Sequence, residues 1–221
     1  MGISKTDFMR GMQCRRMLWL DRNRPEKRVI PPEIQEKLDK GNEFGDGAMS
    51  MFGEYVEVTA LKEDGRLDYS RMIKDTKAYI ESGESVICEA AFSYCGHYCA
   101  VDILRKADRG YEIYEVKNSP ELTEQHLKDV GFQRYVVTRC GVRVLRCFVV
   151  LPGEDGEDYR IVNVSAPAKE YSEWVRDNVF ELNKIKMQKQ EVFVETGLQC
   201  SQPYECWYYE YCHSEENKTK E

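Results

Sequence analysis

The fold of this chain is decided by residues 101–117, which read VDILRKADRGYEIYEVK. Both flanks are rich in β-branched, aromatic and aliphatic residues, and the ADRG between them is a turn sequence, so the stretch predicts a β-hairpin. A loop centred on this turn places Asp102 directly opposite Glu115, with their Cβ atoms roughly 4.5–5.5 Å apart. Lys117 points to the same face as Glu115, because side chains alternate along a strand.

This convergence of charges predicts a metal site, and a solvated surface hairpin is the alternative. Two carboxylates that close repel each other, and the pKa of one rises unless a cation lies between them. Hard oxygen ligands suit Mg²⁺ or Mn²⁺, and Lys117 would hold a water or a phosphate oxygen beside such an ion. The D-x(n)-E-x-K pattern is loose, so these residues alone favour the metal only slightly.

The rest of the chain predicts helices and strands that build a mixed sheet. Apolar periodicity predicts helices over residues 4–20, 33–51, 68–81, 121–139 and 166–190. Apolar and β-branched runs predict strands over residues 55–59, 86–94, 142–151 and 159–164, besides the hairpin. Ser4 and Asp7 form a capping box for the first helix, which includes Cys14. Ser119 and the proline after it mark the start of the fourth. This order predicts an α/β (α+β) fold with helices flanking a central mixed sheet.

The nine cysteines fall into two sets, and their odd number argues against a closed disulfide framework. Five lie in or beside predicted strands and at a helix end, and we interpret them as small core residues. The other four lie near the two ends of the chain: Cys14, Cys200, Cys206 and Cys212. Four thiolates suit a [4Fe–4S] cluster or Zn²⁺, and the wide spacing of the last three favours the cluster. Uncoordinated thiols are the third interpretation.

Composition excludes some classes of protein. No apolar run is long enough to cross a membrane, and the N-terminal region lacks the apolar stretch of a signal peptide, so we expect a cytoplasmic protein. A net charge of −7 argues against a general nucleic-acid coat protein. Local binding stays open, because basic residues cluster over positions 15–28 and 139–146.

Taken in order, these motifs resemble those of the PD-(D/E)xK nuclease superfamily. Within it, the chain is similar to RecB-like exonucleases that carry an iron–sulfur cluster, including the CRISPR adaptation nucleases. The matching segments are residues 4–14, 89–104, 115–117, 129–135 and 200–212. The resemblance implies a restriction-endonuclease-like core over residues 31–189. It also implies that residues 1–30 and 190–221 form a cap joined by a four-cysteine cluster site.

The resemblance also implies roles for individual residues. Asp102 and Glu115 would bind Mg²⁺ or Mn²⁺, together with the backbone carbonyl of Val116. Lys117 would position or activate the attacking water, and Gln133 would steady the site. The family places one cluster cysteine near the start and three near the end, which implies the iron–sulfur ligands Cys14, Cys200, Cys206 and Cys212.

The chain departs from the family pattern at three positions. A histidine that often serves as a further metal ligand is missing from residues 41–45, where Glu43 is the expected substitute and a surface charge is the alternative. The tyrosine that usually lies four residues beyond the glutamine is replaced by Val137. Pro203 stands where relatives with a C-x₂-C spacing have a cysteine.

We therefore expect a divalent-metal-dependent deoxyribonuclease. It would act as an exonuclease on DNA that is single-stranded or has free ends, with phosphates held by basic residues near the N-terminus. Trp207, Tyr208 and Tyr209 would either stack on bases or pack around the cluster. The alternative is a non-catalytic iron–sulfur module that binds DNA or senses redox state, and a third hypothesis is a structural zinc protein.

Overall fold

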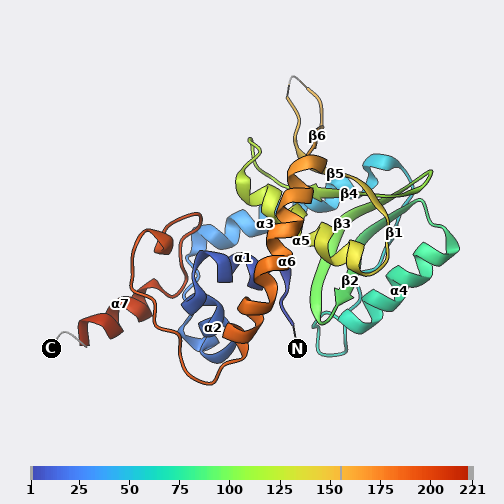
Figure 1. Ribbon diagram of the computed structural model, residues 1–221. Helices are drawn as coiled ribbons and strands as arrows, with labels where there is room; N and C mark the ends of the chain where they lie inside the picture. The colour runs from blue at the N-terminus through green and yellow to red at the C-terminus, as the bar shows by residue number, and fades with distance from the viewer. Residues whose placement is uncertain (1, 155, 219–221) are drawn as a thin grey trace. The chain divides into compact units, whose positions relative to one another are not determined.

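The computed structural model describes residues 2–154 and 156–218, without the side chains of residues 32–35, 37, 38 and 216–218. The chain divides into two compact units (Figure 1). The first, which we call the sheet unit, contains Met1–Gly2 and Asp39–Arg176. The second, the cysteine unit, contains Ile3–Leu38 and Asp177–Glu221.

The sheet unit is built on six strands that lie in sequence order across one sheet. They are β1 Val56–Glu57, β2 Val86–Tyr94, β3 His97–Ala107, β4 Gly110–Val116, β5 Val144–Pro152 and β6 Tyr159–Asn163. The β1–β2 and β4–β5 pairs are parallel and the other three are antiparallel. The expected α/β fold with a mixed sheet flanked by helices is therefore confirmed, and β2 has the expected bounds.

The hairpin predicted from residues 101–117 is also confirmed. β3 pairs with β4 from Ile103–Tyr114 to Ala107–Gly110, so the chain reverses at the predicted ADRG turn. The packed face of Ile103 and Tyr114 contacts Ala48 and Met49, where helix α3 (Pro32–Ala48) passes into the 3₁₀-helix Met49–Phe52. Phe52 meets the Tyr114 ring edge-on, with ring centroids 4.7 Å apart.

Helices α4 (Tyr69–Ser82) and α5 (Glu124–Arg139) also pack on the sheet. The predicted start of α5 was wrong. Thr123, rather than Ser119, caps the helix, because its hydroxyl accepts from the N–H of His126 while the His126 ring accepts from the N–H of Thr123. Ser119 instead donates its hydroxyl to the carbonyl of Glu121. Helix α6 (Ser165–Met187) begins in the sheet unit and continues into the cysteine unit.

The cysteine unit begins with two helices where one was predicted. Helix α1 (Lys5–Gln13) has the expected capping box, since the Ser4 hydroxyl accepts from Asp7 N–H and the Asp7 carboxylate accepts from Ser4 N–H. The helix ends at Cys14, whose extended backbone (φ −153°, ψ 118°) turns the chain into α2 (Arg15–Asn23). The prediction of a single helix with Cys14 inside it was therefore wrong. Helix α7 (Tyr209–Lys218) and the short turns Pro25–Lys27 and Leu198–Cys200 complete the elements described there.

Candidate active site

The two predicted metal-binding carboxylates lie where strands β3 and β4 stop pairing. The register of the Ile103–Tyr114 pair, continued by one position, sets Asp102 opposite Glu115. At this point a side chain replaces the backbone ladder, because Asp102 Oδ2 accepts from the N–H of Val116 at 2.6 Å. In an extended strand the N–H and C=O of one residue point to the same side. The Val116 carbonyl is therefore directed toward Asp102, as a shared metal site requires.

Glu115 is the centre of the site, with only 1% of its surface exposed. The Lys117 Nζ atom lies 2.6 Å from Glu115 Oε1, and Gln133 Nε2 on α5 donates to Oε2. A buried carboxylate is stable in its charged form only when it is paired and hydrogen-bonded. Lys117 and Gln133 supply the ion pair and the hydrogen bond, so the structure brings together the predicted group of Asp102, Glu115, Val116, Lys117 and Gln133.

Lys117 is a firmly charged cation in this arrangement. Burial alone would lower its pKa, but the carboxylates of Asp129, Glu115 and Asp102 outweigh burial and raise the pKa well above the ordinary value. A lysine with a raised pKa stays protonated at neutral pH. A protonated ammonium can hold a water or a phosphate oxygen, which is one of the roles expected for Lys117.

Gln133 shows that the site is not fully satisfied by the side chains around it. Its side chain is completely buried, and within the described residues its Oε1 atom has no hydrogen-bond partner. A buried acceptor without a donor costs about 1–3 kcal/mol, so native structures usually supply one. A water held by a metal ion on Glu115 would be such a donor, and this orphaned oxygen agrees with a hydrated divalent cation at the site.

Glu43 is not brought into the site. It lies exposed on α3, and no contact described for it reaches Asp102 or Glu115. Helix α3 does approach the end of β4, because Asn118 Nδ2 donates to the carbonyl of Lys40 at 3.1 Å. Glu43 stands about one turn beyond Lys40, so its helix is placed near the site while its carboxylate is not part of it.

Sequence reasoning missed Asp129 as a site residue. Its Oδ2 atom lies 2.8 Å from Lys117 Nζ, and its side chain is 17% exposed. Asp129 precedes Gln133 by four positions on α5, and residues with this spacing share one face of a helix. That spacing was the signal that could have identified it once Gln133 was assigned.

Among the described residues, no three His, Cys, Asp or Glu side chains are spaced to hold a metal ion. At the sheet site the carboxylate oxygens have other partners. Lys117 and Gln133 occupy both oxygens of Glu115, and the Val116 N–H occupies one oxygen of Asp102. The donor set of carboxylates and a carbonyl still suits Mg²⁺ or Mn²⁺, and the Lys117 ammonium stands where such a cation would neutralise Glu115.

The four predicted cluster cysteines all belong to the cysteine unit. Cys14 and Cys206 pack against an apolar group that contains Met17, Tyr208 and Cys212. The backbone N–H of Cys206 donates to the carbonyl of Cys200 at 2.8 Å. Electrostatic interactions also link Cys14, Cys200, Cys206 and Cys212 to one another.

Within the described residues, no three of these cysteines are spaced as metal ligands, and the cluster expected to join the chain ends stays a prediction. Burial raises the pKa of Cys206 to about 11 and that of Cys212 to about 12, and it also raises the pKa of Cys14. Metals bind thiolates, whereas neutral thiols pack as small apolar groups. Four soft donors in one unit fit an iron–sulfur cluster or zinc in their chemistry, although their spacing does not.

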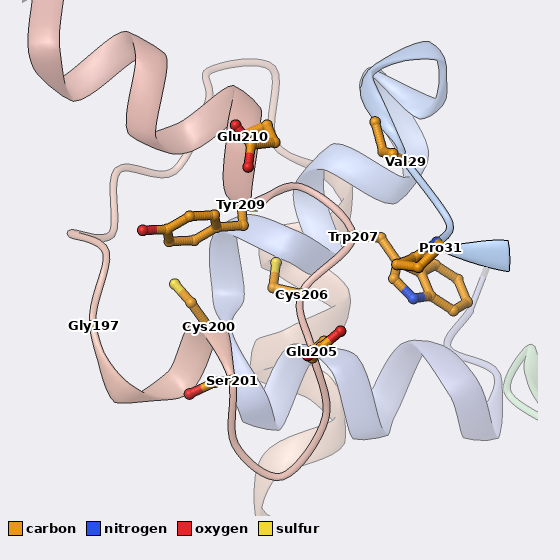
Figure 2. Close-up of a pocket in the computed structure, with 10 residues that line it drawn as sticks. All are labelled: Val29, Pro31, Gly197, Cys200, Ser201, Glu205, Cys206, Trp207, Tyr209 and Glu210. Atoms are coloured by element: carbon orange, nitrogen blue, oxygen red, sulfur yellow. The ribbon is translucent and has the colours of Figure 1, made fainter. Parts of the chain in front are cut away.

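A pocket of about 550 Å³ opens beside Cys200 and Cys206, which both line it (Figure 2). Its aromatic lining residues are Trp207 and Tyr209. The guanidinium of Arg10 lies over the Trp207 ring, 4.2 Å from its centroid.

Tyr208 was also expected to stack on bases or to pack around the cluster, and it takes the packing role. It is 1% exposed and lies in the apolar group of the cysteine unit. Its hydroxyl donates to Asp21 at 2.9 Å.

Comparison with protein-family profiles gave no match to this chain, and comparison with curated proteins gave none either. In the part of the chain that the structure describes, no helix combines the length and the apolar character needed to cross a membrane.

Proposed function

We propose that this protein is a divalent-metal-dependent deoxyribonuclease that removes nucleotides from DNA that is single-stranded or has free ends. One observation carries the proposal. The buried carboxylate of Glu115 forms an ion pair with Lys117 and accepts a hydrogen bond from Gln133. It lies beside Asp102, where strands β3 and β4 separate. Burying this many charges at the end of a hairpin costs stability, which a binding or catalytic role explains.

Each residue has a separate task in this proposal. Asp102 and Glu115 would hold Mg²⁺ or Mn²⁺ with the Val116 carbonyl, and such an ion lowers the pKa of bound water and offsets charge on phosphate. Lys117 holds a phosphate oxygen or the attacking water through its ammonium group. Gln133 fixes the orientation of Glu115, and outer-shell partners of this kind usually matter for metal affinity.

The cysteine unit supplies a second proposed centre. Cys14, Cys200, Cys206 and Cys212 would hold a [4Fe–4S] cluster, with Zn²⁺ as the alternative. Its role would be structural, because ligands from both ends of the chain would be tied together. A cytoplasmic location belongs to the same proposal, since an odd number of cysteines argues against a closed disulfide framework and suits a reducing compartment.

The cysteine unit also offers a surface for the DNA strand. Exposed basic side chains follow α2, at Arg24, Lys27 and Arg28. Within the same unit, Tyr209 and Trp207 line the pocket, and Tyr209 is 43% exposed. Single-stranded nucleic acids are commonly held by basic side chains on phosphates and by aromatic rings on bases. These two features support DNA as the partner.

A non-catalytic DNA-binding or redox-sensing module is the second candidate. The observation in its favour is that Lys117 and Gln133 already occupy both oxygens of Glu115. A site satisfied by its own lysine holds its charges together without a metal, so the same residues are compatible with a purely structural ion pair.

The test is the degradation of single-stranded DNA labelled at either end, with anaerobically purified protein and Mn²⁺ or Mg²⁺. Wild type should shorten the DNA, while Asp102→Ala and Lys117→Ala should not. Asp108→Ala and Arg109→Ala are matched controls, because both residues lie at the exposed turn of the same hairpin. Inert wild type with its metals bound would favour the binding module, and affinity for the same oligonucleotide would then be measured.

A further inference from the structure

Lys117 and a divalent metal would compete for the same carboxylate, and this inference rests on the proposed metal site. The Lys117 Nζ atom lies 2.6 Å from Glu115 Oε1, which is a full ion pair with a buried partner. The other oxygen of Glu115 is held by Gln133. A metal ion that approaches Glu115 Oε1 from the side of Lys117 would have to displace the ammonium group, because a cation and an ammonium repel each other.

Asp129 is the group that would receive the ammonium. It lies 2.8 Å from the same Nζ atom, and the two side chains are 17% and 25% exposed. A partly buried lysine that left Glu115 for no other carboxylate would lose its charge compensation, which is strongly unfavourable. Because Asp129 is already in contact, Lys117 can leave Glu115 and remain paired.

Helix α5 carries both residues that this exchange requires. Asp129 and Gln133 lie four positions apart on α5, so they share the face that meets the site. Gln133 keeps Glu115 in place, and its buried Oε1 atom awaits a donor such as a metal-bound water. The same helix face therefore holds the metal-binding carboxylate and provides the alternative position for the lysine.

We propose that Asp129 is a positioning residue that draws Lys117 from Glu115, so that a divalent metal can take its place. Asp129 acts only through the lysine and is not itself a metal ligand. In the metal-bound arrangement the ammonium stays beside the site, paired with Asp129, where it can hold a phosphate oxygen.

The test is a double-mutant cycle on Mn²⁺ binding, measured by electron paramagnetic resonance without DNA. The four proteins are wild type, Asp129→Asn, Lys117→Met and the double variant. Loss of Asp129 leaves Glu115 as the main partner of Lys117, so Asp129→Asn should weaken binding by about tenfold, within the range of typical site coupling. Lys117→Met removes the competitor and should strengthen binding. In the Lys117→Met background, Asp129→Asn should change the affinity by less than about twofold.

Controls separate this exchange from a general charge effect and from misfolding. Glu124→Gln removes an exposed carboxylate at the start of the same helix and should leave Mn²⁺ affinity unchanged. Circular dichroism checks folding, and Lys117→Gln replaces Lys117→Met if that variant is unstable. Equal weakening by Asp129→Asn in both backgrounds would overturn the exchange, because Asp129 would then act on the metal directly. If neither wild type nor Lys117→Met binds Mn²⁺, the proposed metal site fails as well.

Discussion

Among single residues, Gln133 has the most specific predicted role, which is to orient the Glu115 carboxylate. We predict that Gln133→Ala lowers DNA cleavage and Mn²⁺ affinity by about 10- to 100-fold, the usual effect of losing an outer-shell partner. Glu115 would lose the hydrogen bond that orients it. The measurement is the cleavage rate across a range of Mn²⁺ concentrations. Gln125→Ala, a partly buried residue on the same helix, is the control. Unchanged metal dependence in Gln133→Ala would contradict the assigned role.

The residue scale also shows which contacts a sequence can reveal. The alignment of Asp102 with Glu115 followed from the hairpin alone, because a tight turn determines which residues lie opposite each other. The contact between Asp129 and Lys117 joins a helix to a strand end, so the spacing from Gln133 could indicate a shared helix face but not the ion pair itself. Glu43 lies exposed on its expected helix, which agrees with the alternative interpretation as a surface charge.

Among the helices, α5 and α6 depend on a close approach at Gly131. A Cβ atom there would lie 2.4 Å from the Cβ of Tyr171, so the helices would have to separate. We predict that Gly131→Ala lowers the free energy of unfolding by about 1–3 kcal/mol, as overpacking usually does. Gly45→Ala on α3 is the control. A Cβ atom meets nothing within 4 Å there, and alanine should stabilise that helix by about 0.5–1 kcal/mol. Chemical denaturation of both variants measures the difference, and equal effects would contradict the close approach.

The stability that helix α1 gains through Asp7 should decrease at acidic pH. Burial alone would raise the pKa of Asp7, but hydrogen bonds from Lys186 and Ser4 outweigh burial and lower it. A lowered folded-state pKa means that the stabilisation is present above the unfolded pKa of about 3.9 and disappears as pH falls through the folded value. We predict that Asp7→Ala costs about 1 kcal/mol at pH 7 and much less near pH 3. Thermal unfolding across this pH range is the measurement, and a pH-independent cost would contradict the assignment.

The element boundaries that were mispredicted have local causes. The break at Cys14 has no glycine or proline to mark it, and apolar residues continue on both sides, so the periodicity indicated one helix. The start of α5 was misplaced because Ser119 before a proline has the usual capping pattern. The helix is instead capped by Thr123, whose capping-box partner is the less usual residue His126. At Cys14 an extended backbone interrupts the predicted helix, and at α5 the Thr123–His126 capping box replaces the predicted cap at Ser119.

At the scale of the whole molecule, residues from both ends of the chain form one unit. This unit contains Cys14 together with Cys200, Cys206 and Cys212. Burial raises the pKa values of Cys14, Cys206 and Cys212, so a metal that binds these thiols has to displace their protons. Sequence spacing cannot show this, because the burial arises only once the chain has folded.

The cysteine unit should therefore depend on its metal more than the sheet unit does. We predict that anaerobically purified wild type contains iron and acid-labile sulfide, and that Cys206→Ser loses most of both. Metal binding to such sites contributes directly to folding free energy, because the unfolded chain does not hold the ligands together. Limited proteolysis of Cys206→Ser should cleave residues 3–38 and 177–218 first and spare the strands of residues 86–152. Cys140→Ser, at an exposed thiol of the sheet unit, should keep its iron. Zinc without sulfide in wild type would make the centre a zinc site. A protein without metal whose cysteine unit resists proteolysis would show that the four thiols serve only as packing residues.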